Sequence, residues 1–173
     1  MKKNYSLTLV ACYIGYVIQA IVNNLSPLLF ARFSVQFGIV EWQLTLIVFL
    51  NFAIQIVVDS SSAIIATKLG YRLSTIIAQS CSALGLIFLG VLPHCMPPYA
   101  GILIATFFMA VGGGFVEVVL SPLIEALPLK NKSGAMCFLH SFYCWGHIFV
   151  VLAATLFFNV FSIDNWMYLP IIL

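Results

Sequence analysis

The sequence alternates between long apolar runs and short gaps that hold most of its charged residues. A helix rises about 1.5 Å per residue, so about 20 mainly apolar residues cross the hydrocarbon of a bilayer. The runs predict five complete membrane-spanning helices and the start of a sixth, over residues 5–30, 42–67, 73–92, 99–127, 134–158 and 166–173. We therefore expect an all-α, polytopic membrane protein with a single transmembrane domain over residues 1–173.

The first and last runs need separate comment. The first is too long for a signal peptide and carries Asn23 and Asn24 before any convincing cleavage site, so we predict an uncleaved helix. The last run, from Trp166 to Leu173, has less than half of the length of a crossing. From this we expect a truncated product or a fragment. With the sixth helix restored, the crossings would form two groups of three, as in the inverted repeats of secondary transporters.

The seven lysines and arginines predict the orientation of the helices. Six of them lie at the N-terminus or in alternate gaps between the runs: Lys2, Lys3, Lys68, Arg72, Lys130 and Lys132. Basic residues in short loops resist translocation, so this pattern places the N-terminus and these gaps in the cytoplasm. Only Arg32 falls in a gap on the other side. The membrane that we expect is the bacterial inner membrane.

Composition narrows the class of protein. The chain is 63% hydrophobic and 7% charged, which leaves too little polar surface to cover a water-soluble globule. The net charge of +2 belongs to the gap residues, and no basic patch predicts nucleic-acid binding. Four of the five cysteines lie inside apolar runs, so we expect no disulfide framework. No nucleophile with its base, phosphate-binding loop or zinc motif is present, which argues against an enzyme and against a cofactor or metal.

Glu117 is the strongest candidate for a functional residue. It lies well inside the run 99–127, where a charge costs about 3 kcal/mol and normally faces a cavity or a partner. Burial disfavours the ionised form of a carboxyl group, which suits reversible proton uptake. A structural hydrogen bond between helices is the alternative. The glycines at 112–114 and Pro122 predict a pliable stretch or a close helix contact around it.

The fifth predicted helix carries a polar face. His140, Tyr143, Cys144 and His147 are spaced so that they share one side of a helix. Counted from the helix ends, His140 and Glu117 lie at similar depth, so we expect them to meet as a proton relay or as part of a sugar-binding rim. The spacing also resembles that of metal ligands. Because no carboxylate stands beside them in the helix, we favour polar contacts between helices over a metal site.

Side-chain amides form a second polar group. They are Gln19, Asn23 and Asn24 in the first predicted helix and Asn51 and Gln55 in the second. An amide both donates and accepts hydrogen bonds, so it matches the hydroxyl groups of a sugar. Hydrogen bonding between helices is the alternative interpretation.

Two further acids lie near the predicted cytoplasmic ends of helices. Asp59 continues the four-residue spacing of Asn51 and Gln55, and Glu125 precedes Pro128. Both are close in sequence to basic gap residues, so we expect them to form ion pairs at the membrane interface.

Several stretches resemble a known family. The order of helices and the loop Lys68–Arg72 are similar to the N-terminal half of a major facilitator superfamily transporter, with Thr67 and Tyr71 departing from its loop signature. A more specific likeness, to the fucose-permease-type sugar:proton symporters, rests on Asn23, Asn24, Leu25, Gly114, Phe115, Val116, Glu117, Ser121, Pro122, Leu139, His140, Ser141, Phe142 and Gly146. The resemblance implies that Glu117 serves proton coupling and sugar binding. Pro27 stands where that group has a second acid.

The function that we expect is secondary active transport of a small polar solute such as a sugar, coupled to protons through Glu117 by alternating access. The chain would be the N-terminal half of the transporter, and its partner a C-terminal six-helix half or a second copy. A half-size transporter that acts as a dimer and a non-transporting membrane scaffold or assembly protein are the alternatives. The predicted binding residues are Glu117, His140, Tyr143, His147, Asn23, Asn24, Asn51 and Gln55.

Overall fold

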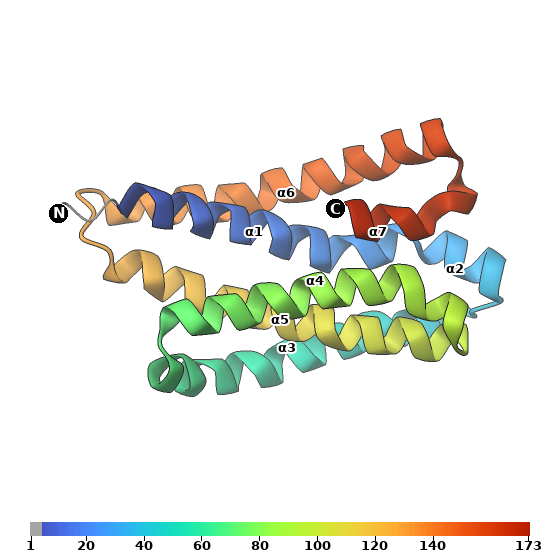
Figure 1. The fold of residues 1–173 in the computed structure, drawn as a ribbon, viewed down its shortest axis with the longest axis horizontal. Coiled ribbons are helices and arrows are strands. Elements are labelled where there is room, and N and C mark those ends of the chain that lie inside the picture. Colours follow the sequence, from blue (N-terminus) through green and yellow to red (C-terminus); the bar gives the residue numbers. More distant parts are fainter. Residues whose placement is uncertain (1–4) are drawn as a thin grey trace.

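A computed structural model describes residues 5–173, apart from the side chains of Ser62 and Ala63. Over this range the chain is helical and contains no strand (Figure 1). The elements are α1 (Tyr5–Leu28), α2 (Phe30–Phe37), α3 (Glu41–Leu69), α4 (Tyr71–Cys95), α5 (Pro98–Ala126), α6 (Lys132–Phe161), the 3-10 helix η1 (Ile163–Tyr168) and α7 (Leu169–Ile172).

Five helices are long and apolar enough to cross a membrane. Their candidate spans are Tyr5–Leu28, Glu41–Ser61, Tyr71–Cys95, Pro98–Ala126 and Lys132–Phe161. The all-α class and the five long apolar helices predicted from the apolar runs are therefore confirmed, and such helices are typical of an integral membrane protein. Large apolar side chains also cover the outer faces of the helices, including Phe49 on α3 and Leu156 on α6. Such faces suit contact with lipid.

The helix ends differ from the prediction at three places. The first run ends at Leu28, after Pro27, and continues as the separate helix α2 up to Gly38, whose φ of 64° closes it in the left-handed conformation. Helix α4 continues through Pro93 to Cys95, past its predicted end. The final segment begins as a 3-10 turn, and its α-helix starts only at Leu169.

Helix α5 packs closely on α4 at the turn that contains Pro93. A proline removes one backbone donor, and membrane helices tolerate it where the surrounding structure compensates. Gly101 of α5 lies against this turn, since an ideal Cβ at Gly101 would be 2.8 Å from the carbonyl carbon of Leu92. The α5 backbone therefore packs directly on the segment that the sequence predicted to be a loop.

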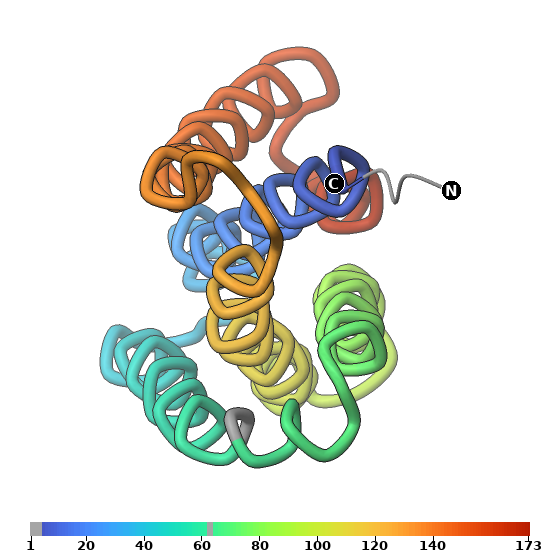
Figure 2. The backbone as a smooth tube through the Cα atoms, turned by 90° about the vertical axis from the view of Figure 1, so that its left-hand side faces the viewer, coloured from blue at the N-terminus to red at the C-terminus, as the bar shows by residue number. Residues whose placement is uncertain are grey.

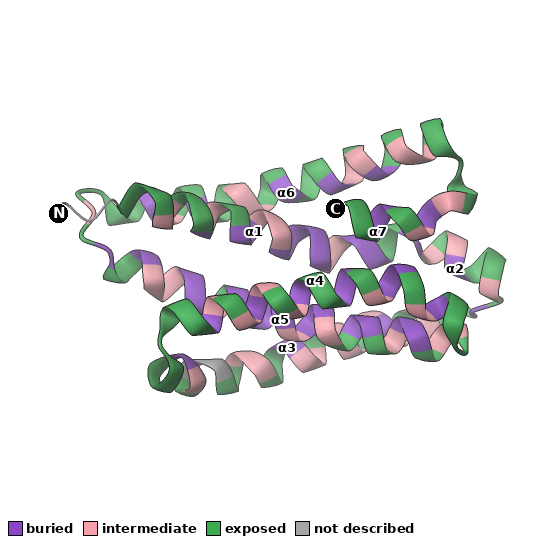
Figure 3. Cartoon of the chain, viewed as in Figure 1, coloured by how far each residue is buried: buried purple, intermediate pink, exposed green. Residues whose placement is uncertain are grey.

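Helices α1 and α5 occupy the centre of the bundle (Figure 2). Helix α6 packs on α1, α3 packs on α5, and α4 packs on α5 and on α7. Buried positions concentrate where these helices face one another, while exposed positions cover the outer surfaces (Figure 3). This arrangement leaves α3 and α6 as flanking helices on the same side of the central pair.

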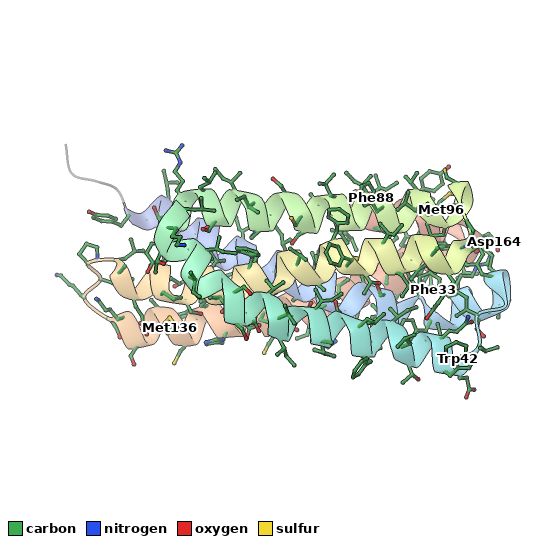
Figure 4. All side chains as sticks on the ribbon, turned by 90° about the horizontal axis from the view of Figure 1, so that it is seen from below. Phe33, Trp42, Phe88, Met96, Met136 and Asp164 are labelled. Carbon is green, nitrogen blue, oxygen red and sulfur yellow. The ribbon has the colours of Figure 1, made fainter. Side chains whose placement is uncertain are left out.

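The basic gap residues all lie at one end of the bundle. The α3–α4 and α5–α6 connections lie at the same end as the start of α1 (Figure 1). Lys130 lies in the second connection, and Lys68, Arg72 and Lys132 lie in the helix turns that adjoin the two connections. We call this the basic end. Trp42, Met96 and Asp164 lie at the opposite end, called here the far end (Figure 4). Lys2 and Lys3 of the predicted pattern fall outside the described residues.

Arg32, the exception to the charge pattern, is neutralised at the far end. Its guanidinium group forms an ion pair with Asp164. Its Nε also donates to Gln36 Oε1 at 3.1 Å, and the same oxygen accepts a 2.7 Å hydrogen bond from Trp166 Nε1. The indole of Trp166 is completely buried and packs edge-on against Phe33, with ring centroids 5.3 Å apart. Helix α2 and η1 are thus joined by packing, hydrogen bonds and a charge pair.

Placement of the basic end in the cytoplasm stays a prediction, which thiol labelling tests. Cys95 is exposed at the far end. In a variant with the other cysteines replaced, Cys95 and the thiol introduced by Lys68→Cys should react from opposite sides of sealed vesicles, and Lys68→Cys only from the cytoplasmic side. The measurement is modification by a membrane-impermeant maleimide. Reaction of both thiols from one side would contradict the topology.

Candidate functional site

A polar cavity of about 350 Å³ lies among the two central helices and the two flanking helices. Its lining residues are Tyr16, Gln19 and Asn23 of α1, Phe52 and Gln55 of α3, Glu117 of α5, and His140, Tyr143 and Cys144 of α6. The α1 residues are three and four positions apart, so they share one helix face. The cavity therefore draws its polar groups from four segments that are far apart in the sequence.

Glu117 lines this cavity with its side chain exposed. One of its oxygens, Oε2, accepts a 3.1 Å hydrogen bond from Gln19 Nε2. Gln19 is only 2% exposed, and its Oε1 is buried with no hydrogen-bond partner. The carboxyl group is thus held by a neutral amide. None of the lysines and arginines in the described residues stands beside it in the cavity.

An amide of α1 and an amide of α3 bind each other beside α5. Gln55 Nε2 donates to Asn23 Oδ1 at 2.7 Å. An ideal Cβ at Gly113 would lie 3.1 Å from Asn23 Oδ1 and 3.4 Å from Gln55 Nε2. The absence of a side chain at Gly113 therefore lets this amide pair lie against the helix that carries Glu117.

Tyr16 contacts both α5 and α6. Its hydroxyl shares a 2.8 Å hydrogen bond with Ser121 Oγ. Its ring meets the imidazole of His140 edge-on, with centroids 5.6 Å apart. Tyr16 was not among the residues predicted for the site. Its position three residues before Gln19 and seven before Asn23 was the signal that places it on the same face.

Some predicted residues meet at the cavity and others do not. Glu117, His140, Tyr143, Asn23 and Gln55 all line it, so Glu117 and His140 share one cavity. The remaining three, which lie elsewhere, are His147, Asn24 and Asn51.

His147 faces a neighbouring groove along α6, which it lines with Tyr143 and Cys144. Asn24 and Asn51 line a neighbouring cavity of about 140 Å³ toward the far end, which shares Asn23 and Phe52 with the Glu117 cavity. Asn24 also uses its amide locally, since Nδ2 donates to the carbonyl oxygen of Ala20 at 2.8 Å. The eight predicted residues therefore do not share one cavity. The polar side chains of each helix lie at different distances along the helix axis, so they reach different cavities.

The ion pairs expected for Asp59 and Glu125 are not found either. In the described part of the chain the only ion pair joins Arg32 to Asp164. Lys132 Nζ donates to the main-chain oxygen of Glu125 and not to its carboxylate. Asp59 turns toward α5, where its Oδ1 is buried without a hydrogen-bond partner. The expectation used proximity in sequence and did not account for the inward direction of the Asp59 side chain.

The chemistry of the cavity suits a polar solute that is neutral or positively charged. A carboxyl group, amides, phenols and an imidazole supply both donors and acceptors, and none of the lysines and arginines in the described residues lines the cavity to bind an anion. Among residues 5–173, apart from the two undescribed side chains, no group of three or more His, Cys, Asp or Glu residues is placed to hold a metal ion. A larger groove of about 550 Å³ on α6 and α1 is lined mainly by apolar side chains such as Phe138 and Trp145, which suits lipid contact.

Comparison of the chain with protein-family models, with curated proteins and with solved structures finds no match.

Proposed function

We propose that the chain is the N-terminal six-helix half of a secondary transporter of the major facilitator type, which moves a small polar solute such as a sugar with proton coupling through Glu117. The observation that carries the proposal is the cavity itself. An acidic side chain, amides from two helices and the imidazole of His140 converge within apolar helices. Polar and ionisable groups at such a position are costly in a membrane, so they mark solute or ion pathways.

The packing of the helices supports this type of fold. Helix α6, the fifth crossing, packs on α1, the first, while α3, the second, packs on α5, the fourth. Exchanging the first crossing with the fourth and the second with the fifth turns one pair into the other. That relation is the one expected for an inverted repeat of three helices, which places a binding site between the repeats.

The exposed polar face of α6 supports a partner beside the cavity. His140, Cys144 and His147 are all exposed on this face. Ionisable side chains facing lipid are disfavoured, and such residues normally face a bundle interior or water. A second six-helix unit, either a C-terminal half or a second copy of the chain, would cover this face and close the cavity for alternating access.

Solute protection of Cys144 tests the proposal. Cys144 is exposed and lines the cavity, while Cys137 is exposed on the same helix but does not line it. In membranes that contain the full chain, a hexose that occupies the cavity should slow the alkylation of Cys144 by at least about tenfold, which corresponds to occupancy near saturation. The rate at Cys137 should stay unchanged.

Uptake measurements separate the alternatives. A labelled hexose should accumulate under an inward proton gradient in vesicles that contain the chain together with its second six-helix unit. Collapse of the gradient should stop this accumulation. Uptake by the chain alone would identify a transporter that works as a dimer. A membrane scaffold predicts neither protection nor uptake with any member of a panel of neutral and cationic polar solutes, and that result would overturn the proposal.

A further inference from the structure

Asp59 is the acidic side chain that the cavity leaves unexplained. It lies on α3 within a candidate membrane span, and its Oδ1 is buried with no hydrogen-bond partner. Neither Lys68 nor Arg72 forms an ion pair with it in the described structure. An ionised carboxylate oxygen that is buried without a donor or a cation is strongly disfavoured.

The position of Asp59 relates it to Glu117. An ideal Cβ at Gly114 would lie 3.0 Å from Asp59 Oδ1, so the carboxyl group occupies the space that the missing side chain leaves on α5. Gly114 is three residues before Glu117 and therefore on the same face, about one helical turn away. Asp59 thus approaches the helix of Glu117 from α3 while Gln19 approaches it from α1.

A second orphan acceptor lies beside this pair. Gln19 donates through Nε2 to Glu117, but its Oε1 is buried and has no donor. The other titratable groups that line the cavity are Tyr16 on α1 and His140, Tyr143 and Cys144 on α6. None of these is a lysine or an arginine. Two buried acceptor atoms at this place, Gln19 Oε1 and Asp59 Oδ1, thus lack a donor, which is the condition that a bound proton relieves.

A proton fits this position better than a metal ion. Hard cations such as Ca²⁺ and Mg²⁺ take six or more oxygen ligands, by general rule. Besides Asp59 Oδ1, the atoms nearest to the space at Gly114 are Cγ1 and Cβ of Val58, at 3.0 and 3.2 Å. A proton needs only the carboxyl oxygen itself.

We propose that Asp59 is a second proton-binding carboxyl group of the Glu117 site, and that it carries its proton while Glu117 is ionised. Two carboxyl groups that lie against the same stretch of α5, one beside Gly114 and the other on Glu117, do not readily ionise together. The proton binds to an oxygen of Asp59 and leaves from the same oxygen, so no other reactant is required. The participation of this proton in solute coupling rests on the proposed transport function.

Infrared spectroscopy tests the proposal without any solute. The chain has five acidic residues, and the four other than Asp59 are exposed: Glu41, Glu117, Glu125 and Asp164. The purified full chain in lipid nanodiscs at neutral pH should show the carbonyl band of a protonated carboxyl group, shifted to lower frequency in D2O. Asp59→Asn should remove the whole band, while Glu117→Gln and the control Glu125→Gln should keep it.

The outcomes separate this proposal from the proposed function. Absence of the band in the unaltered chain, or its persistence in Asp59→Asn, would overturn the role of Asp59 whether or not the chain transports. Loss of the band in Glu117→Gln together with its persistence in Asp59→Asn would assign the proton to Glu117 and also overturn the proposal. If Asp59→Asn does not fold, the glycine substitutions described next decide the assignment.

A neighbouring pair of glycines provides a second test. Gly114→Ala places a methyl group against Asp59, whereas Gly113→Ala meets Asn23 and Gln55 instead. Gly114→Ala should therefore shift the carboxyl band, because it changes the surroundings of that group, and Gly113→Ala should leave the band in place. A band that responds to Gly113→Ala but not to Gly114→Ala would place the proton elsewhere.

Discussion

Replacement of Glu117 by glutamine is expected to lower proton-driven solute accumulation by about 100-fold, the lower end of what the loss of a proton-transferring side chain costs. Glutamine keeps the size of the side chain and an oxygen that can accept the hydrogen bond from Gln19 Nε2. It cannot take up and release a proton. The measurement is uptake of a labelled hexose into vesicles under an imposed pH gradient.

The same variant should still bind the solute. Because the cavity keeps its shape, protection of Cys144 by the hexose should persist in Glu117→Gln. Glu125→Gln is the matched control, since Glu125 is exposed near the basic end of the same helix and does not line the cavity. Uptake that is unaffected by Glu117→Gln would remove this carboxyl group from the mechanism.

Gly112→Ala is expected to cause the largest loss of stability among the single substitutions considered. An ideal Cβ at Gly112 would lie 2.3 Å from Ser82 Oγ, 2.6 Å from the backbone nitrogen of Ser82 and 3.0 Å from the carbonyl oxygen of Ala78. Two of these atoms belong to the α4 backbone, so the helices themselves must separate. Overpacking of this kind lowers the free energy of unfolding by about 3 kcal/mol.

Gly113→Ala is the control for this effect. Its Cβ would meet only the side-chain ends of Asn23 and Gln55, which can shift by a few tenths of an ångström. We expect Gly113→Ala to retain stability and to weaken the protection of Cys144, because the amide pair is displaced. Unfolding in mixed micelles measures the stability of both variants. Equal losses would show that α4 and α5 are not in the close contact described.

The helices could be predicted because each crossing is specified locally. Hydrocarbon offers no hydrogen-bond partner to a backbone group, so a long apolar run must form a helix wherever it crosses lipid. The ends were less predictable. Pro93 would normally stop a helix, yet α4 continues to Cys95, and Gly101 of α5 packs against that turn. Nothing within α4 itself indicates this contact.

The candidate site was predictable only in part. Glu117 stood out as an acid within an apolar run, and its depth placed it near His140. The amides were harder to assign, since Asn23 lines both the Glu117 cavity and the smaller cavity, whereas its neighbour Asn24 lines only the smaller one. Asp59 was assigned to the membrane interface from its neighbours in the sequence, whereas its carboxyl group lies against Gly114.

The spacing of apolar runs and basic gaps is thus sufficient to specify a helical chain with the character of an integral membrane protein, because the free energy of transferring a segment into lipid depends on that segment alone. Which side chains line the cavity depends instead on how the helices are rotated about their axes and how closely they approach one another. Glycines at 112–114 set that approach between α3, α4 and α5, so the pairing of Gln55 with Asn23 and of Asp59 with α5 arises only when the helices are assembled.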